Sequence, residues 1–173
     1  LENIDPFDLV FKLLIEEDSV SIIAFEINEE DMCLVLTHPL SMVGSDGYAL
    51  ATYGVLSEGK PHPRSYGTFP RVLGRYVRKK KLLTLHDAIR KMTSLPAQRI
   101  GLENRGMLHK GYYADIVIFN AKEIIDKATY ANPHQYPDGV EYMLVNGQVV
   151  VEKGEHTGVL AGKVLRFVNS RPQ

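Results

Sequence analysis

The chain has 173 residues, a formal net charge of −1 and 45% hydrophobic residues. This length suffices for one good domain core, and the composition is typical of a water-soluble globular protein. It excludes a membrane-spanning helix, because no window holds the ~18 unbroken apolar residues that a span needs. A single cysteine, Cys33, excludes an internal disulfide and suits a reducing compartment, so we expect a cytoplasmic protein with no membrane partner.

The charges are unevenly distributed along the chain. Residues 1–33 carry ten acids and one base, whereas residues 60–110 carry thirteen Lys and Arg and two acids. Solvated faces explain both runs; the alternatives are an anionic substrate or nucleic acid. We expect no nucleic-acid partner, because no helix-turn-helix, zinc or RNA-binding motif accompanies the basic run. The chain starts at Leu1 without Met or a signal peptide, so we interpret it as a piece of a longer protein.

The first third of the sequence predicts a helix, a strand, a second helix and a second strand. Asp5-Pro6 begins an amphipathic helix as N-cap and first residue. Val20 to Ile27 is apolar on both faces and predicts a buried parallel strand. Asn28 caps the next helix, which Pro39 ends, with Cys33 in the core and His38 at the helix end. Met42 to Gly44 is the next strand, so the pattern is a right-handed βαβ unit.

Asp46 directly follows that second strand and lies between Gly44-Ser45 and Gly47. The carboxyl end of parallel strands is where barrels and open α/β sheets carry out chemistry. The long segment 47–69 then contains His62-Pro63-Arg64, in which Pro63 stiffens the backbone between two polar side chains. Surface solvation explains His62 and Arg64 equally well from these residues alone, although an Arg fork also binds a carboxylate bidentately.

The rest of the chain predicts three further helices and then β structure. The pattern predicts a helix over 70–81, a helix capped by Thr84 with Asp87, and a short helix over 96–100. From Arg105 the character turns to β. The strongest local signal is Asn146-Gly147, which predicts a hairpin between strands at 142–145 and 148–151, after an earlier strand at 114–119.

Three stretches of the sequence closely resemble the C-terminal part of N-acyl-D-amino-acid deacylases (D-aminoacylases). They are Met42-Val43-Gly44-Ser45-Asp46-Gly47, His62-Pro63-Arg64-Ser65-Tyr66-Gly67-Thr68-Phe69-Pro70-Arg71-Val72-Leu73 and Lys91-Met92-Thr93-Ser94-Leu95-Pro96-Ala97. The run from Arg105-Gly106 to Ala114-Asp115-Ile116-Val117, and Val145-Asn146-Gly147, are similar to amidohydrolases more widely. A hydantoinase- or dihydroorotase-like substrate therefore remains an alternative.

The resemblance implies a zinc-dependent TIM-type barrel that carries a small β-sandwich and hydrolyses N-acyl-D-amino acids. By motif and position it makes Asp46 the general base and a metal ligand. It places Arg64 to bind the substrate carboxylate, with His62 and Tyr66 lining that pocket. The family's His-x-His motif, its metal-binding Cys and its two later metal-binding His residues are missing here. We therefore expect no zinc to be bound by this chain alone, and no activity from it.

The length also predicts an incomplete barrel, because a (β/α)₈ barrel needs at least ~200 residues. We interpret the chain as an α/β fragment: residues 1–104 supply the last two βα units, with the active-site loop 47–69, and residues 105–173 supply part of the sandwich. Exposed strand edges and apolar helix faces predict self-association or a poorly ordered 48–68 segment. A non-catalytic binding or assembly module with an amidohydrolase-like tail is the alternative, motivated by the basic segment 60–110.

Overall fold

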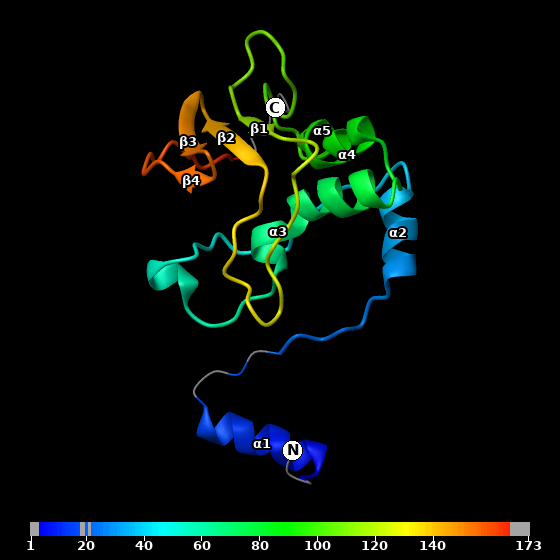
Figure 1. Ribbon diagram of the computed structural model, residues 1–173, viewed down its shortest axis with the longest axis vertical. Coiled ribbons are helices and arrows are strands. Elements are labelled where there is room, and N and C mark those ends of the chain that lie inside the picture. Colours follow the sequence, from blue (N-terminus) through cyan, green and yellow to red (C-terminus); the bar gives the residue numbers. More distant parts are fainter. Residues whose placement is uncertain (1–3, 18–19, 21, 167–173) are drawn as a thin grey trace, which may run out of the picture.

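The computed structural model describes residues 4–17, 20 and 22–166. In this part of the chain the helices all end before residue 100 and the strands all begin after residue 115. The helical elements are α1 (Pro6–Glu16), α2 (Glu29–Thr37), the 3-10 helix η1 (Gly54–Ser57), α3 (Arg64–Arg71), the π-helix η2 (Val72–Lys79), α4 (Leu85–Met92) and α5 (Ser94–Arg99). The strands β1 (Ile116–Phe119), β2 (Val140–Val145), β3 (Gln148–Glu152) and β4 (Glu155–His156) form one antiparallel sheet in that order. Figure 1 shows the sheet beside α3 to α5, with α1 set apart from this body on an extended segment.

The predicted helix starts are confirmed by their capping hydrogen bonds. The Asp5 carboxylate accepts from the backbone N–H of Phe7 at 2.9 Å, and Pro6 follows as the first helical residue. The Asn28 side chain accepts from the N–H of Asp31 at 2.8 Å. The Thr84 hydroxyl accepts from the N–H of Asp87 at 3.1 Å. Each cap satisfies one of the backbone donors that a helix leaves unpaired in its first turn.

The two predicted parallel strands are wrong for the described residues. Residues 20 and 22–27 and residues 42–44 carry no strand, and residue 21 lies outside the described residues. A parallel strand needs a neighbouring strand to accept and donate its backbone hydrogen bonds. The backbone N–H of Val43 instead donates to the carbonyl of Lys91 at 3.1 Å. An apolar run therefore predicted the wrong structure here, because hydrophobicity does not supply a strand partner.

The predicted helix over 70–81 starts earlier than expected and changes type. The helix begins at Arg64, so the loop that the sequence predicts over 47–69 ends at Pro63. That loop contains η1. Pro70 lies inside α3, and the chain continues as a π-helix from Val72. Proline lacks a backbone donor and its ring clashes with the carbonyl one turn back, which loosens a helix at that point.

The predicted hairpin is confirmed. β2 and β3 pair with Val145 opposite Gln148, and the turn residues Asn146 and Gly147 have φ values of 50° and 81°. Both values lie in the left-handed region that a type I′ turn requires, which explains the Asn-Gly pair. β1 pairs with β2 on its other side, within the strand predicted at 114–119.

The motifs shared with amidohydrolases in general meet in one network at this hairpin. The Arg105 guanidinium contacts the Asp115 carboxylate and donates to the Asn146 side-chain oxygen at 2.7 Å. Asp115 accepts from the Asn146 backbone N–H at 2.8 Å, and the Asn146 amide donates to the carbonyl of Ala161 at 2.7 Å. Burial raises the pKa of Asp115, but the Asn146 N–H and the Arg105 guanidinium outweigh it and hold this pKa below its usual range. These residues join the hairpin to the segments before and after it.

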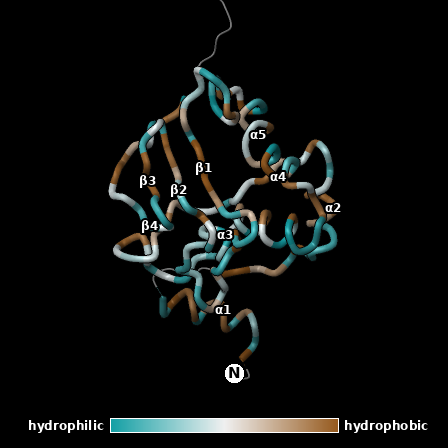
Figure 2. The backbone as a smooth tube through the Cα atoms, turned by 45° about the horizontal axis from the view of Figure 1, so that its top comes forward, coloured by the Kyte–Doolittle hydropathy of each residue, from teal (hydrophilic) through white to brown (hydrophobic). Residues whose placement is uncertain are grey.

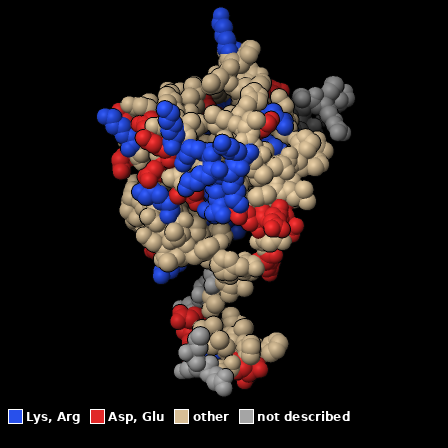
Figure 3. Space-filling model, turned by 45° about the vertical axis from the view of Figure 1, so that its right-hand side comes forward, with Lys and Arg blue, Asp and Glu red and all other residues tan. Residues whose placement is uncertain are grey.

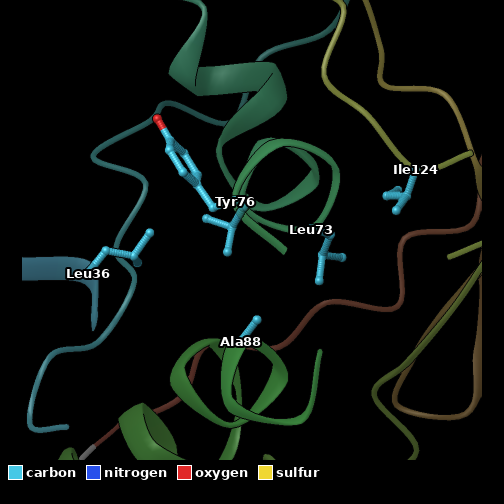
Figure 4. Packing of buried hydrophobic residues seen from close by; sticks show 6 residues of the cluster. Leu36, Leu73, Tyr76, Ala88 and Ile124 are labelled. Carbon is cyan, nitrogen blue, oxygen red and sulfur yellow. The ribbon is translucent and has the colours of Figure 1, made fainter. Parts of the chain in front are cut away.

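One hydrophobic cluster joins the helical and β parts of the chain. Figure 4 shows side chains from α2, η2 and α4 in one cluster with Ile124, which lies between β1 and β2; Leu73 of η2 lies between Leu36 and Ile124. The helix η2 approaches this segment closely, because a Cβ built on Gly74 would lie 2.5 Å from the Ile124 carbonyl oxygen. The buried members of the cluster are Leu36, Val72, Leu73, Tyr76, Ala88 and Ile124.

Apolar side chains are exposed on α1 and on the segment that follows it. The stripe predicted for α1 forms, but Phe11 is 63% and Ile15 is 84% exposed, and Phe25 in the next segment is 76% exposed. Figure 2 shows hydrophobic residues along α1, as on the strands of the body. No helix in the described part of the chain is long and apolar enough to cross a membrane.

Figure 3 shows Lys and Arg side chains gathered on one face, beside acidic residues. Glu29, the first residue of α2, forms ion pairs with Arg75 at 2.8 Å and Lys80 at 2.7 Å, and accepts from the Tyr76 hydroxyl at 3.1 Å. The hydrogen bond from Lys80, aided by Tyr76 and Arg75, lowers the pKa of Glu29 to about 2. The acidic start of α2 is thereby attached to η2.

Candidate active site

Asp46 lies at a corner of the backbone that packs onto the first turn of α3. Its φ of 48° is left-handed, which is uncommon outside glycine but is tolerated by Asp and Asn. A Cβ on the next residue, Gly47, would lie 2.9 Å from the Ser65 Cα, so only glycine permits this approach without a shift. The Tyr48 N–H donates to the Ser65 hydroxyl at 3.2 Å and closes the corner.

Arg64 holds Asp46 through two contacts. Its Nη2 lies 2.8 Å from Asp46 Oδ2, and its Nε donates to the Asp46 carbonyl at 2.8 Å. The Asp46 side chain is 84% exposed and the Arg64 side chain 41% exposed, so the pair is open to solvent. Two residues that the sequence places 18 positions apart therefore meet, and the left-handed Asp46 backbone is held by the guanidinium.

His62 joins this pair in its neutral form. Its Nδ1 accepts from the backbone N–H of Arg64 at 3.0 Å, so the ring hydrogen resides on Nε2, which lies 3.3 Å from the Tyr130 hydroxyl. Burial lowers the pKa of His62, and the Arg64 charge lowers it further, while Asp46 opposes both. A charged imidazole carries a hydrogen on both ring nitrogens and has no acceptor for the Arg64 N–H. The hydrogen bond and the lowered pKa of His62 therefore both indicate a neutral ring.

Tyr66 lies apart from the other three residues. Its ring is buried, and its hydroxyl donates to the carbonyl of Ala51 at 2.7 Å and lies 2.8 Å from Nδ1 of His134. Burial raises the pKa of Tyr66, and Tyr136 raises it further. The structure thus brings Asp46, Arg64 and His62 together and turns Tyr66 toward the loop that connects Asp46 to His62.

A cavity of about 690 Å³ adjoins the site. His62 and Arg64 line one side of it and Gly44 another, while α2 and η2 supply much of the apolar wall. Asp46 is not among the lining residues and meets the cavity through its ion pair with Arg64. A mostly apolar cavity with a few polar groups is the usual form of a small-molecule site.

Lys91 is a residue of this region whose contacts sequence reasoning missed. It is 2% exposed, and its ammonium donates to the carbonyl of His38 and, at 3.1 and 2.9 Å, to the carbonyl and hydroxyl of Ser41. Burial lowers the pKa of Lys91, and neighbouring Arg90 lowers it further. Lys91 ties the segment that leads to Asp46 onto α4. The signal available was its place in Lys91–Ala97, one of the three stretches that resemble D-aminoacylases.

Two further missed contacts face the cavity. Arg71 of α3 forms an ion pair with Asp126 at 2.7 Å, and both residues line the cavity wall. Tyr130 lies edge-on to the His62 ring at 5.1 Å between centroids. Asp126 and Tyr130 belong to the loop between β1 and β2, and nothing in their local sequence marks them. Only the fold brings this loop against α3.

Residues 34–151 match the amidohydrolase family, and the chain belongs to that family. Within it, the chain is 44% identical over 128 residues to the N-acyl-D-glutamate deacylase of Alcaligenes xylosoxydans xylosoxydans, covering 74% of this chain and 25% of that protein. It is 41% identical over 143 residues to the D-aminoacylase of the same organism, covering 83% of this chain and 28% of that protein. The resemblance predicted from the motifs is confirmed.

Solved structures agree with these relatives. A crystal structure of D-aminoacylase matches with a TM-score of 0.75 and 40% identity, covering 83% of this chain and 29% of that one. The N-acyl-D-glutamate deacylase of Bordetella bronchiseptica, complexed with zinc and a phosphonate mimic of the tetrahedral intermediate, matches with a TM-score of 0.66 and 41% identity, covering 73% and 25%. The chain therefore spans between a quarter and a third of the length of these relatives.

Proposed function

We propose that this chain is the C-terminal part of a zinc-dependent hydrolase that cleaves N-acyl-D-amino acids to a D-amino acid and a carboxylate. The identity to D-aminoacylase and N-acyl-D-glutamate deacylase supports the reaction class. The short share of those relatives that it spans supports an incomplete catalytic unit. In this proposal residues 1–104 correspond to the last two βα units of a TIM-type barrel, and residues 105–173 are the C-terminal part of a β-sandwich. The strand segments of those units form no strand in the described residues, because the strands they would pair with belong to the rest of the barrel.

The observation that carries the proposal is the meeting of Asp46 and Arg64 beside the cavity. Asp46 is the general base: its carboxylate accepts a proton from the attacking water and returns it to the leaving nitrogen as the amide bond breaks. Its exposure supports this role, since the oxygens are open to a reactant. The hydrogen bond from Arg64 Nε to the Asp46 carbonyl fixes the backbone from which those oxygens project.

Arg64 binds the α-carboxylate of the substrate in this proposal. A guanidinium presents two parallel donors to a carboxylate, and here it already binds one, that of Asp46. The substrate carboxylate therefore competes with Asp46 for Arg64, and its binding releases Asp46 for proton transfer. His62, neutral beside Arg64, lines the same pocket without repelling the guanidinium. Tyr66 supports that pocket through the loop it holds.

Zinc does not fit the residues of this chain by themselves. A protein zinc site takes three or four side-chain ligands, and the described residues include no group of three His, Cys, Asp or Glu that could hold a metal. Asp46 supplies one ligand at most, and we assign the others to residues outside this sequence. When bound in the complete site, zinc supplies a water that ionises near neutral pH.

Turnover of N-acetyl-D-methionine tests the proposal directly. We expect no hydrolysis by this chain alone, and hydrolysis when the chain is extended to the length of its relatives. N-acetyl-L-methionine is the matched control substrate. Chelator-sensitive hydrolysis by the chain alone would overturn the incomplete-site proposal, and an extended, zinc-loaded chain that turns over neither isomer would overturn the reaction class.

The alternative function, a binding or assembly module, is motivated by the basic segment 60–110. Most of its cationic side chains contact other groups of the same chain, which leaves fewer of them to bind an acidic partner. The residues with such internal contacts are Arg64, Arg71, Arg75, Arg78, Lys80, Arg90, Lys91 and Arg105. The internal pairing favours the hydrolase.

A further inference from the structure

Two tyrosine–histidine pairs join the segment from Asp46 to the first turn of α3 with the loop between β1 and β2. In one, Tyr130 of this loop meets His62 at 3.3 Å; in the other, Tyr66 meets His134 of this loop at 2.8 Å. Figure 1 shows the loop between β1 and β2 descending from the sheet along α3 to reach this position. The second pair also reaches back to the segment after Asp46, at Ala51 and at Gly59.

The ring nitrogens of His134 make different hydrogen bonds from those of His62. Nε2 of His134 lies 2.9 Å from the carbonyl of Gly59, which only accepts, so Nε2 carries a hydrogen. Nδ1 lies 2.8 Å from the Tyr66 hydroxyl, and this hydroxyl also lies 2.7 Å from the carbonyl of Ala51, which again only accepts. Tyr66 has a single hydroxyl hydrogen to share between these two positions.

The proton count of His134 therefore decides which contacts are made. When the imidazole is charged, Nδ1–H donates to Tyr66, the Tyr66 hydroxyl donates to Ala51, and Nε2–H donates to Gly59. When it is neutral with the hydrogen on Nε2, the Tyr66 hydroxyl turns to Nδ1, and the Ala51 carbonyl loses its donor. The charged form makes three hydrogen bonds and the neutral form two.

We propose that His134 is a positioning residue of the Asp46–Arg64 site, and that protonation of its imidazole fastens the loop of residues 48–62 through Tyr66, Ala51 and Gly59. Ala51 lies near the start of that loop and Gly59 near its end, so the relay holds both halves against α3. The inference rests on the proposed function for the meaning of the site, but its contacts do not depend on that function.

Several titratable side chains lie near the His134 ring or beside its hydrogen-bond partners. They include Tyr66 of α3 and Tyr136, whose ring centroid lies 6.1 Å from that of Tyr66. Glu58 and Lys60 flank Gly59, whose carbonyl lies 2.9 Å from Nε2. Histidine changes charge between about pH 5 and pH 8. The fastened loop accompanies the charged imidazole, so the Ala51 carbonyl loses its donor when the imidazole becomes neutral.

Hydrogen exchange of the loop amides in the whole chain tests the proposal, with rates corrected for the intrinsic effect of pH. We expect the 48–60 amides to be about tenfold more protected at pH 5.5 than at pH 8, the scale of one charge-assisted hydrogen bond. His134→Gln removes this pH dependence, and Tyr66→Phe lowers protection at both values. His109→Gln, at an exposed histidine in a different segment, is the matched control and retains it.

Nitrogen NMR of the histidine rings gives a second readout that needs no variant. We expect hydrogens on both ring nitrogens of His134 at pH 5.5 and on Nε2 alone at pH 8. Equal loop protection at the two pH values, or a hydrogen on Nδ1 alone at pH 8, would overturn the proposal. These measurements do not use turnover, so they are independent of the proposed function. If the loop responds as expected but the extended chain hydrolyses no substrate, the proposed function is wrong and the His134 relay still holds.

Discussion

The Asp46–Arg64 pair shows how one side chain holds the backbone and the carboxylate of another. Asp46 has a left-handed backbone, a conformation that costs free energy and persists only when its surroundings hold it. Arg64 supplies that hold through both the backbone carbonyl and the carboxylate. The residue assigned to proton transfer is thus exposed in its side chain but fixed in its backbone.

Asp46→Asn tests the proton-transfer role in the chain extended to the length of its relatives. Asn keeps the size, tolerates the left-handed backbone and still accepts from Arg64, but it does not take a proton. We expect kcat to fall by about 10²–10⁴-fold, the usual contribution of a general base. Steady-state kinetics measure this, with exposed Glu58→Gln as the control; an unchanged kcat removes Asp46 from the mechanism.

Glu29→Gln tests the ion pairs that attach α2 to η2. The folded pKa of Glu29, about 2, lies below that of a free glutamate, near 4.3. A lowered folded pKa gives a stabilisation that is present above the unfolded pKa and is lost as the pH falls toward 2. We expect the difference in denaturation midpoint between wild type and variant at pH 7 to shrink by pH 2.5.

Urea denaturation at the two pH values measures this difference, with Glu30→Gln in the same first turn of α2 as the control. The pairs are half exposed, so the effect is modest and weakens with salt. A difference in midpoint that stays the same at both pH values would show that Glu29 contributes by some route other than its charge.

The elements of this chain are joined by close backbone approach as much as by apolar packing. Helix η2 packs against the segment of Ile124 and Ile125 at Gly74, and the chain enters η2 directly after Pro70 has loosened α3. The backbone hydrogen bonds change from the α to the π pattern at this point, which accommodates the proline. A glycine at 74 is what permits η2 to lie against a backbone carbonyl.

Gly74→Ala tests this close approach. The added Cβ would lie 2.4 Å from the Ile125 Cδ1 atom and 2.5 Å from the Ile124 carbonyl oxygen. The side chain has room to move but the carbonyl does not, so we expect a loss of about 1–3 kcal/mol in unfolding free energy, the range for overpacking. Chemical denaturation measures it. Gly162→Ala, with nothing within 4 Å, is the control and stays near wild type.

Large apolar side chains are exposed along α1 and the segment that follows it. The α1 stripe and the segment after it carry Phe11, Ile15, Ile22, Phe25 and Ile27, all largely exposed. In the proposed barrel these faces pack against the other βα units. Surface of this kind drives association when its partner is missing.

Light scattering of the 173-residue chain tests whether the exposed apolar surface drives association. We expect its apparent mass to rise with concentration, and we expect Phe11→Ser with Ile15→Ser, on one face of α1, to reduce that rise. Asp8→Ser on the same helix is the control for loss of a side chain without loss of apolar area. A monodisperse monomer over the whole concentration range would contradict the fragment interpretation.

Local sequence determined the features that depend on neighbours along the chain. The caps at Asp5, Asn28 and Thr84 and the Asn146-Gly147 hairpin were predicted correctly, because each depends on interactions within a few residues. The family was predicted correctly as well, since its motifs are contiguous. Asp46 and Arg64 were chosen from the same motifs, and the structure places them in contact.

Tertiary structure alone decided the features that depend on distant partners. The apolar runs at 20–27 and 42–44 formed no strand in the described residues, because a strand exists only with a neighbour to bond. Helix α3 began before Pro70, and Tyr66 turned to His134 across 68 positions of sequence. Such contacts depend on how the whole chain closes on itself, and no local pattern encodes that closure.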